Sequence, residues 1–212
     1  MNLKEAFRFQ NRLQQLMEEA NNILSKEKNV VKVENTTLQS KVDSGAEDVT
    51  TYDIPDTEFA EQITEVAVLL VYLLDEREKL SYAIRKAKQG MDFDFDGEVS
   101  LNVRRQEIAK TFRKMAEIRA SERTLANAGV GYRFNADGNQ ISYRCDLKKV
   151  TTINFDRNKV RSYATGLSKK ADQVSAELDK HMVNTEVSYE APFDVNDSFA
   201  EVLQAHIDSN KT

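Results

Sequence analysis

The sequence predicts a mainly α protein, an antiparallel helical bundle or long helical hairpin with an inserted β-hairpin. Three observations lead to this fold class. The 212 residues include only two prolines and seven glycines, so few positions force a helix to break. Long segments repeat apolar residues at alternating spacings of three and four, which places them on one helix face. Between two of these segments the apolar spacing changes to two, which is typical of strands.

Composition and length favour a single helical domain over residues 1–212. Hydrophobic residues make up 40% and charged residues 31% of the chain, as in soluble folded proteins. The longest apolar run, 66–74, is far shorter than the roughly 20 residues of a membrane helix, so no membrane partner is expected. Cys145 is the only cysteine, and 1–6 lack a secretory signal pattern, which together indicate a cytoplasmic protein.

The first two helices carry the widest apolar faces. The first is predicted over 3–26, and the second begins after Pro55, where Asp56 or Thr57 can cap it, and ends at Gly90. The first apolar stripe comprises Ala6, Phe9, Leu13, Leu16, Ala20 and Ile23. The second comprises Phe59, Ile63, Val66, Leu70, Leu73, Leu80, Ile84 and Ala87. Because 66–74 is apolar on all sides, we expect several neighbours around it.

Three further helices follow. The third is predicted over 99–122, with Ile108, Phe112 and Met115 on its apolar face. The fourth is capped by Asp156, and a short last helix is capped by Asp197 or Ser198. The fourth stripe comprises Val160, Ala164, Leu167, Ala171, Val174, Leu178 and His181.

Two segments read as β-structure. Residues 130–155 alternate apolar and polar side chains on both sides of the turn 136–139, which predicts a β-hairpin between the third and fourth helices. Residues 30–54 contain short β-type pieces around a polar turn. They form either a loop or a small β arm.

An acidic segment between the second and third helices resembles the start of a calcium loop. Asp92, Asp94 and Asp96 alternate before Gly97, with Glu98 following. The twelfth position of such a loop is a bidentate glutamate, whereas here it is Val103. Calcium is therefore a possible ligand of this segment, and the competing interpretation is a short strand with solvated carboxylates. No cofactor is otherwise expected.

A basic cluster is the best candidate for binding an anion. The net charge of −5 disfavours general nucleic-acid binding, but residues 99–124 hold seven Lys and Arg against three Asp and Glu. Beside aromatic residues of the hairpin they would suit a nucleotide or single-stranded nucleic acid. The simpler interpretation is a solvated mixed-charge face or pairing with an acidic protein surface. The candidate residues are Arg104, Arg105, Lys110, Arg113, Lys114, Arg133 and Arg144.

Nothing in the sequence points to catalysis. The seven glycines are scattered, and no nucleophile, zinc-protease or phosphate-loop motif is present. His181 and His206 stand without a surrounding motif, and a lone histidine is usually a packing or helix-end residue.

Both ends of the chain resemble a group of proteins. The residues that carry the likeness are 1–10, 174–180 and 191–199. They resemble uncharacterised helical proteins of Gram-positive bacteria and of their phages or mobile elements. The resemblance implies a small cytoplasmic protein that works through association, and it implies no activity and no site residues.

These observations favour a non-enzymatic interaction or assembly protein. Wide apolar stripes on long helices exceed what a chain of this size covers alone, so we expect it to self-associate, or to bind another protein, through coiled-coil-like seams. The alternative is an anion- or calcium-binding protein. The predicted association seam comprises Leu13, Leu16, Leu70, Leu73, Leu167 and Leu178.

Overall fold

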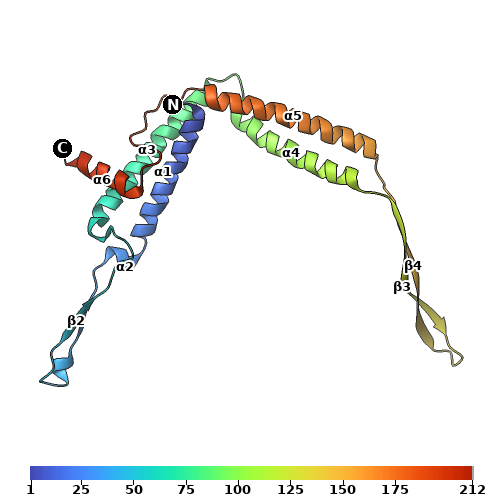
Figure 1. Ribbon diagram of the computed structural model, residues 1–212, viewed down its shortest axis with the longest axis horizontal. Helices are drawn as coiled ribbons and strands as arrows, with labels where there is room; N and C mark the ends of the chain where they lie inside the picture. Colours follow the sequence, from blue (N-terminus) through green and yellow to red (C-terminus); the bar gives the residue numbers. More distant parts are fainter. Residues whose placement is uncertain (212) are drawn as a thin grey trace. The chain divides into compact units, whose positions relative to one another are not determined.

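The structure is a computed structural model that describes residues 1–211, and over this range the protein is mainly α, as predicted. Six α-helices and two antiparallel two-stranded sheets follow one another along the described chain (Figure 1). None of the described helices combines the length and the apolar content needed to cross a bilayer.

The chain divides into two compact units, where the sequence predicted one domain over 1–212. The first unit consists of Met1–Asp94 and the described part of Asp179–Thr212. The second is the intervening segment Phe95–Leu178. The first unit is thus discontinuous in sequence, and the second is inserted within it.

Helix α1 (Leu3–Leu24) forms the predicted stripe and buries all of it. Asn2 caps the helix: its side chain accepts a hydrogen bond from the Glu5 amide, and the Glu5 carboxylate accepts one from the Asn2 amide, both at 2.9 Å. This reciprocal cap satisfies two amides that have no partner within the helix. Leu3 extends the buried face by one turn beyond the predicted stripe.

Helix α3 (Ile63–Gln89) begins later than predicted. Asp56 and Thr57 do not cap it. The Asp56 carboxylate pairs with Lys28 at 3.0 Å, and the Thr57 hydroxyl accepts from the Phe59 amide at 3.2 Å. A short 3₁₀-helix, η2 (Ala60–Gln62), then leads into α3. Side-chain turns of this kind offer the backbone an alternative to helix, which explains the late start.

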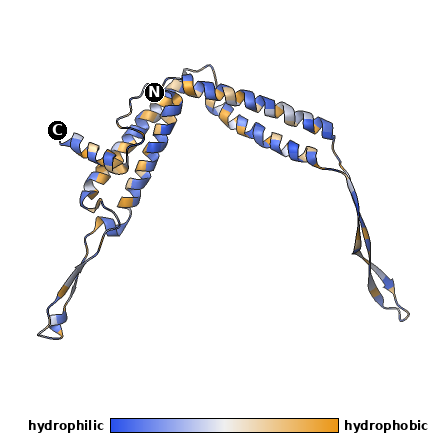
Figure 2. Cartoon of the chain, in the orientation of Figure 1, coloured by the Kyte–Doolittle hydropathy of each residue, from blue (hydrophilic) through white to orange (hydrophobic). Residues whose placement is uncertain are grey.

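Helices α1 and α3 pack against each other in antiparallel order. Gln10 lies against Ser81, and Gln14 accepts a hydrogen bond from Arg77 one turn along. Apolar residues recur along both helices (Figure 2). Along α3 the buried residues are Val66, Leu69, Leu73, Glu76, Leu80 and Ile84. Leu69 therefore occupies the seam position that was predicted for Leu70, which is half-buried.

The C-terminal segment (residues 185–198) runs back over α1 and completes the core of the first unit. The amide of Leu3 donates to the Thr185 carbonyl at 2.9 Å, and the Val187 amide donates to the Met1 carbonyl at 2.8 Å. Phe9 of α1 packs on the ring of Phe193, with centroids 5.1 Å apart. Helix α6 (Phe199–Asn210) follows, capped by Ser198 rather than Asp197, and it buries its Phe199, Val202 and Leu203.

Between α1 and α3 lies a small β arm, one of the two alternatives for residues 30–54. After the single-turn helix α2 (Glu27–Val30), strand β1 (Glu34–Thr37) pairs antiparallel with β2 (Val49–Tyr52) around a 3₁₀ turn, η1 (Gln39–Lys41). All eight strand residues are exposed. The first strand starts directly after Val33, the end of the β-type piece 31–33.

The second unit contains α4 (Phe95–Glu117) and α5 (Arg157–Asn184), whose last turn belongs to the first unit. Asp156 caps α5 as predicted, through a 3.0 Å bond from the Lys159 amide. The buried residues of the two helices are Phe95, Asn102 and Ala109 of α4 and Ala164, Ala171 and Val174 of α5. The α5 stripe matches the prediction, whereas α4 turns Ile108 outward and buries Ala109 instead.

The hairpin between α4 and α5 is longer than predicted. Strand β3 (Ser121–Phe134) pairs with β4 (Gln140–Thr151), so the structure starts nine residues before 130 and residues 121–122 are strand, not helix. A bulge between Leu125 and Gly129 contains Asn127 at φ 55°, whose amide donates to the Asp146 carboxylate at 3.1 Å. The turn uses Gly138 at φ 78°, a conformation that glycine adopts without strain.

Candidate association surface

Three of the six leucines predicted as an association seam are core residues of the chain itself. Leu13, Leu16 and Leu73 are completely buried within the first unit. Leu70, Leu167 and Leu178 are half-buried. The pairing of α1 with α3, closed by the C-terminal segment and α6, covers these three leucines without a second chain. The exposed apolar residues are therefore better candidates for an association surface.

The outer face of α3 is such a surface. Val68, Val71 and Leu74 are 48, 61 and 44% exposed. At 100° per residue, Val71 lies on the side of the helix opposite to the buried Leu69, Leu73 and Leu80. The three side chains cover about two turns. We call Val68, Val71 and Leu74 the α3 apolar face.

A second exposed apolar face lies on α4. Leu101 and Ile108 are 52 and 44% exposed and stand seven residues apart, two turns along the same side of the helix. The basic residues Arg104 and Lys114 of the same helix are also exposed. We call Leu101 and Ile108 the α4 apolar face.

The predicted basic cluster is divided among several different environments. Arg104 pairs with Glu107 at 2.8 Å on the surface, whereas Arg105 lies on the inner side of α4, where it pairs with Glu98 at 2.6 Å. The hydrogen bond from Arg105, helped by its charge, lowers the pKa of Glu98. Arg105 is therefore already committed to an internal partner.

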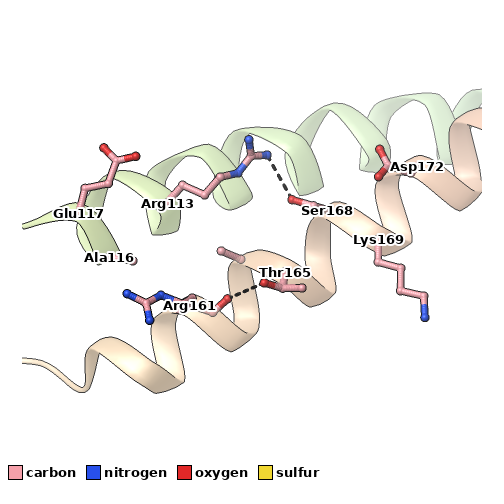
Figure 3. Close-up of a pocket in the computed structure, with 9 residues that line it drawn as sticks. Arg113, Ala116, Glu117, Arg161, Thr165, Ser168, Lys169 and Asp172 are labelled. Atoms are coloured by element: carbon pink, nitrogen blue, oxygen red, sulfur yellow. Dashed lines mark hydrogen bonds between the residues drawn. The ribbon is translucent and has the colours of Figure 1, made fainter.

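Arg113 contributes to a groove between α4 and α5. Its guanidinium donates to the Ser168 hydroxyl at 3.1 Å, and Figure 3 shows it reaching across to α5 while Lys169 extends away from α4. The groove has a volume of about 750 Å³. Its charged lining residues are Arg113, Glu117, Arg161, Lys169 and Asp172. Lys110 lines an adjoining groove with Arg113.

The two arginines predicted on the hairpin face in opposite directions. Arg133 lies over the ring of Tyr143, 6.0 Å from its centroid. Arg144 is the cross-strand partner of Val130, one pair along from Gly131 and Tyr143. Successive pairs place their side chains on opposite faces of a two-stranded ribbon, so Arg144 and Tyr143 lie on opposite faces. The structure therefore does not gather Arg133 and Arg144 with the arginines of α4 into one site.

The acidic segment forms neither a twelve-residue calcium loop nor the short strand that was its alternative. Helix α4 begins at Phe95, so Asp96 and Glu98 belong to its first turn, where carboxylates complement the positive helix end. The Glu98 carboxylate forms an ion pair with Arg105. Asp92 and Asp94 precede the helix. Among residues 1–211 no group of three or more His, Cys, Asp or Glu side chains is arranged to hold a metal ion.

Glu76 is an inner polar residue that the sequence patterns did not single out. Its side chain is 9% exposed, and both of its oxygens are used: Tyr189 donates to one at 2.7 Å, and Lys79 approaches the other at 2.6 Å. Burial, and then the hydrogen bond to Glu76, raise the pKa of Tyr189 well above its ordinary value. This cluster joins the C-terminal segment to α3 and offers no open position for a substrate.

The two histidines are packing residues, as expected from their isolation in the sequence. His206 stacks on Tyr72 with centroids 4.6 Å apart, and burial lowers its pKa. His181 stacks on Phe93 at 4.7 Å.

Comparisons with protein-family models, with curated proteins and with solved structures gave no match for this chain.

Proposed function

We propose that the protein is a non-enzymatic assembly protein that binds a second copy of itself through the α3 apolar face. The observation that supports this proposal is the exposure of Val68, Val71 and Leu74 on the side of α3 opposite to its core. Burying apolar surface is worth about 25 cal/mol per Å². Contiguous exposed apolar patches are typical of interaction sites.

The surroundings of the face also favour a helical partner. A groove beside it is lined by Leu74, Arg77, Glu78, Ser81, Tyr82 and Arg85. An apolar stripe next to a groove on a long helix is the arrangement into which the ridge of another helix packs. A helix of the second copy lying against α3 would extend the α1–α3 pair into an antiparallel bundle, the finer form of the predicted fold.

We place this assembly in the cytoplasm, where Cys145 stays reduced. An origin in a phage or mobile element stays a prediction, based on the resemblance of the chain ends alone.

Sedimentation of Val71→Gln tests the proposal. Glutamine is neutral and a good helix former, so the substitution removes apolar contact area without disturbing α3 or adding charge. We expect wild-type protein to associate in the micromolar range and the variant to raise the dissociation constant by about tenfold, the equivalent of burying one valine.

Val42→Gln is the matched control. Val42 is 95% exposed in the β arm, so its substitution should leave the dissociation constant unchanged. Circular dichroism checks that both variants keep the wild-type helix content. A wild-type protein that sediments as a monomer up to about 100 μM, or equal effects of the two substitutions, would contradict the proposal.

A further inference from the structure

The two compact units carry opposite net charges. Residues 95–178 contain 16 Lys and Arg against 10 Asp and Glu, a net charge of +6. The remaining residues, 1–94 and 179–212, contain 14 against 25, a net charge of −11. The overall value of −5 conceals this separation.

The same contrast holds around the two apolar faces. Residues 64–78, which include the α3 apolar face, carry Glu65, Asp75, Glu76 and Glu78 against Arg77, a net charge of −3. Residues 101–115, which include the α4 apolar face, have a net charge of +4. The charged residues there are Arg104, Arg105, Lys110, Arg113 and Lys114, with Glu107 opposing.

We propose that the α3 apolar face of one copy binds the α4 apolar face of the next copy, so that the association is head-to-tail. This inference rests on the proposed self-association and specifies its partner surface. Pairing the α3 apolar face with itself would bring two acidic segments together, and like charges across an interface cost several kcal/mol. Pairing it with the α4 apolar face brings opposite charges together and covers both sets of exposed apolar side chains. Glu76 and Arg105 already have internal partners, and without them the two segments carry −2 and +3.

The geometry of the two segments suits this pairing. Each has 15 residues, which span about 22 Å of helix. Such a seam is smaller than the roughly 800 Å² per partner of a standard interface, so each contact is weak and depends on concentration and charge. A head-to-tail contact leaves one face open at each end, so copies continue to add unless the rotation closes a ring.

Paired charge reversals test this arrangement. The first variant, Arg104→Glu with Lys114→Glu, lowers the net charge of residues 101–115 from +4 to 0. The second, Asp75→Lys with Glu78→Lys, makes the α3 surface basic. All four side chains are exposed, so both variants should fold, and circular dichroism checks that they do.

We expect each variant alone to associate at least about tenfold more weakly than wild type. The first variant has no net positive α4 segment left to meet its acidic α3 segment, and the second brings two positive segments together. An equimolar mixture should recover association to within about threefold of wild type, because the unchanged acidic α3 segment of the first variant can bind the unchanged basic α4 segment of the second. Wild-type protein should also grow beyond a dimer as its concentration rises.

Two results would overturn the head-to-tail pairing. One is a wild-type assembly that stops at a dimer, together with a mixture that associates no better than its components. Dispersal by Val71→Gln would then still support self-association, so the two proposals fail separately. The other is binding of a labelled oligothymidylate by wild type that the Arg104→Glu, Lys114→Glu variant loses, which would assign the basic surface to nucleic acid.

Discussion

Glu76 shows how a single residue can depart from the pattern around it and still serve the fold. The buried positions of α3 are spaced at three and four, and Glu76 occupies one of them between Leu73 and Leu80. A carboxylate there is stable only because Tyr189 and Lys79 supply hydrogens to both of its oxygens. The cost of burying the charge is thus offset by attaching the C-terminal segment to α3.

Tyr189→Phe should loosen this attachment. The substitution keeps the ring contact with Phe9, whose centroid lies 6.0 Å away, but it leaves one oxygen of Glu76 without its donor. We expect a loss of about 1–3 kcal/mol in the opening free energy of the segment. Hydrogen exchange of residues 186–193, followed by mass spectrometry, measures this as a faster exchange rate.

Tyr82→Phe is the control, because Tyr82 is exposed and the ring keeps its contact with Arg85. Exchange rates that are equal in the two variants would show that the Glu76 cluster does not hold the segment.

At the scale of elements, α4 illustrates a seam that apolar spacing misplaces. The spacing of Ile108, Phe112 and Met115 predicted one face, but the helix turns Ala109 and Asn102 toward α5. The Asn102 amide donates to the Ala171 carbonyl at 3.2 Å and to the Ser175 hydroxyl at 2.9 Å. A buried asparagine that satisfies a backbone carbonyl of the neighbouring helix is not detected by a count of large apolar residues.

The pairing of Glu98 with Arg105 should make the second unit sensitive to acid. The pKa of Glu98 is lowered below its ordinary value of about 4.5 by the Arg105 hydrogen bond. A carboxylate with a lowered pKa in the folded state contributes stability that is fully present above the ordinary value, and this stability is lost as pH falls through the lowered value.

Glu98→Gln should therefore melt at a lower temperature than wild type at about pH 7, and the difference should shrink as the pH falls below the ordinary pKa of about 4.5. Thermal unfolding at a series of pH values from about 7 downward measures this. Glu107→Gln is the control, since its pair with Arg104 is more exposed and contributes less. A difference between Glu98→Gln and wild type that persists in acid would rule out the charge as its source.

Strand β3 shows why the hairpin was predicted too short. Residues 121–129 include several good helix formers, and only their partners in β4 make them a strand. Farther along, the Tyr143 ring lies over Gly131: a Cβ there would lie 2.5 Å from the ring, so any other residue would require the ring to shift. Cross-strand partners are not visible in the local pattern from which a strand is predicted.

Considered as a whole, the molecule leaves much surface uncovered. Its accessible area is 15188 Å², whereas two separate compact bodies of the same total mass would expose roughly 12,000 Å². The excess comes in part from the two hairpins, whose residues are mostly exposed. Two-stranded ribbons are only marginally stable in water unless another element covers them. This favours contacts with further chains.

Salt should weaken the proposed self-association of the protein. If opposite charges hold the copies together, raising sodium chloride from about 0.05 to about 0.5 M should raise the dissociation constant, since screening shortens the range of charge interactions. Light scattering over this range measures the effect, with circular dichroism as the check on folding. Association that grows stronger with salt would indicate apolar contacts alone.

The mainly α class, the stripe of α1 and that of α5 could all be predicted, because apolar spacing alone determines the buried face of an amphipathic helix. The division into two units and the role of Glu76 could not, since both depend on which distant segments meet. The association surface was predicted on Leu13 and Leu73 because they are large apolar residues. Such residues are expected to be buried, but the sequence does not show whether the same chain or a second chain covers them.

The return of residues 185–198 over α1 has a consequence for synthesis on the ribosome. Leu3 and Phe9 are synthesised well before the Thr185 carbonyl, Tyr189 and Phe193 that contact them. The inserted segment 95–178 can fold while translation continues, but α1 stays incompletely covered until residues 185–198 have been synthesised. Chaperone capture is therefore to be expected early in translation, and premature termination should be more damaging than loss of either hairpin.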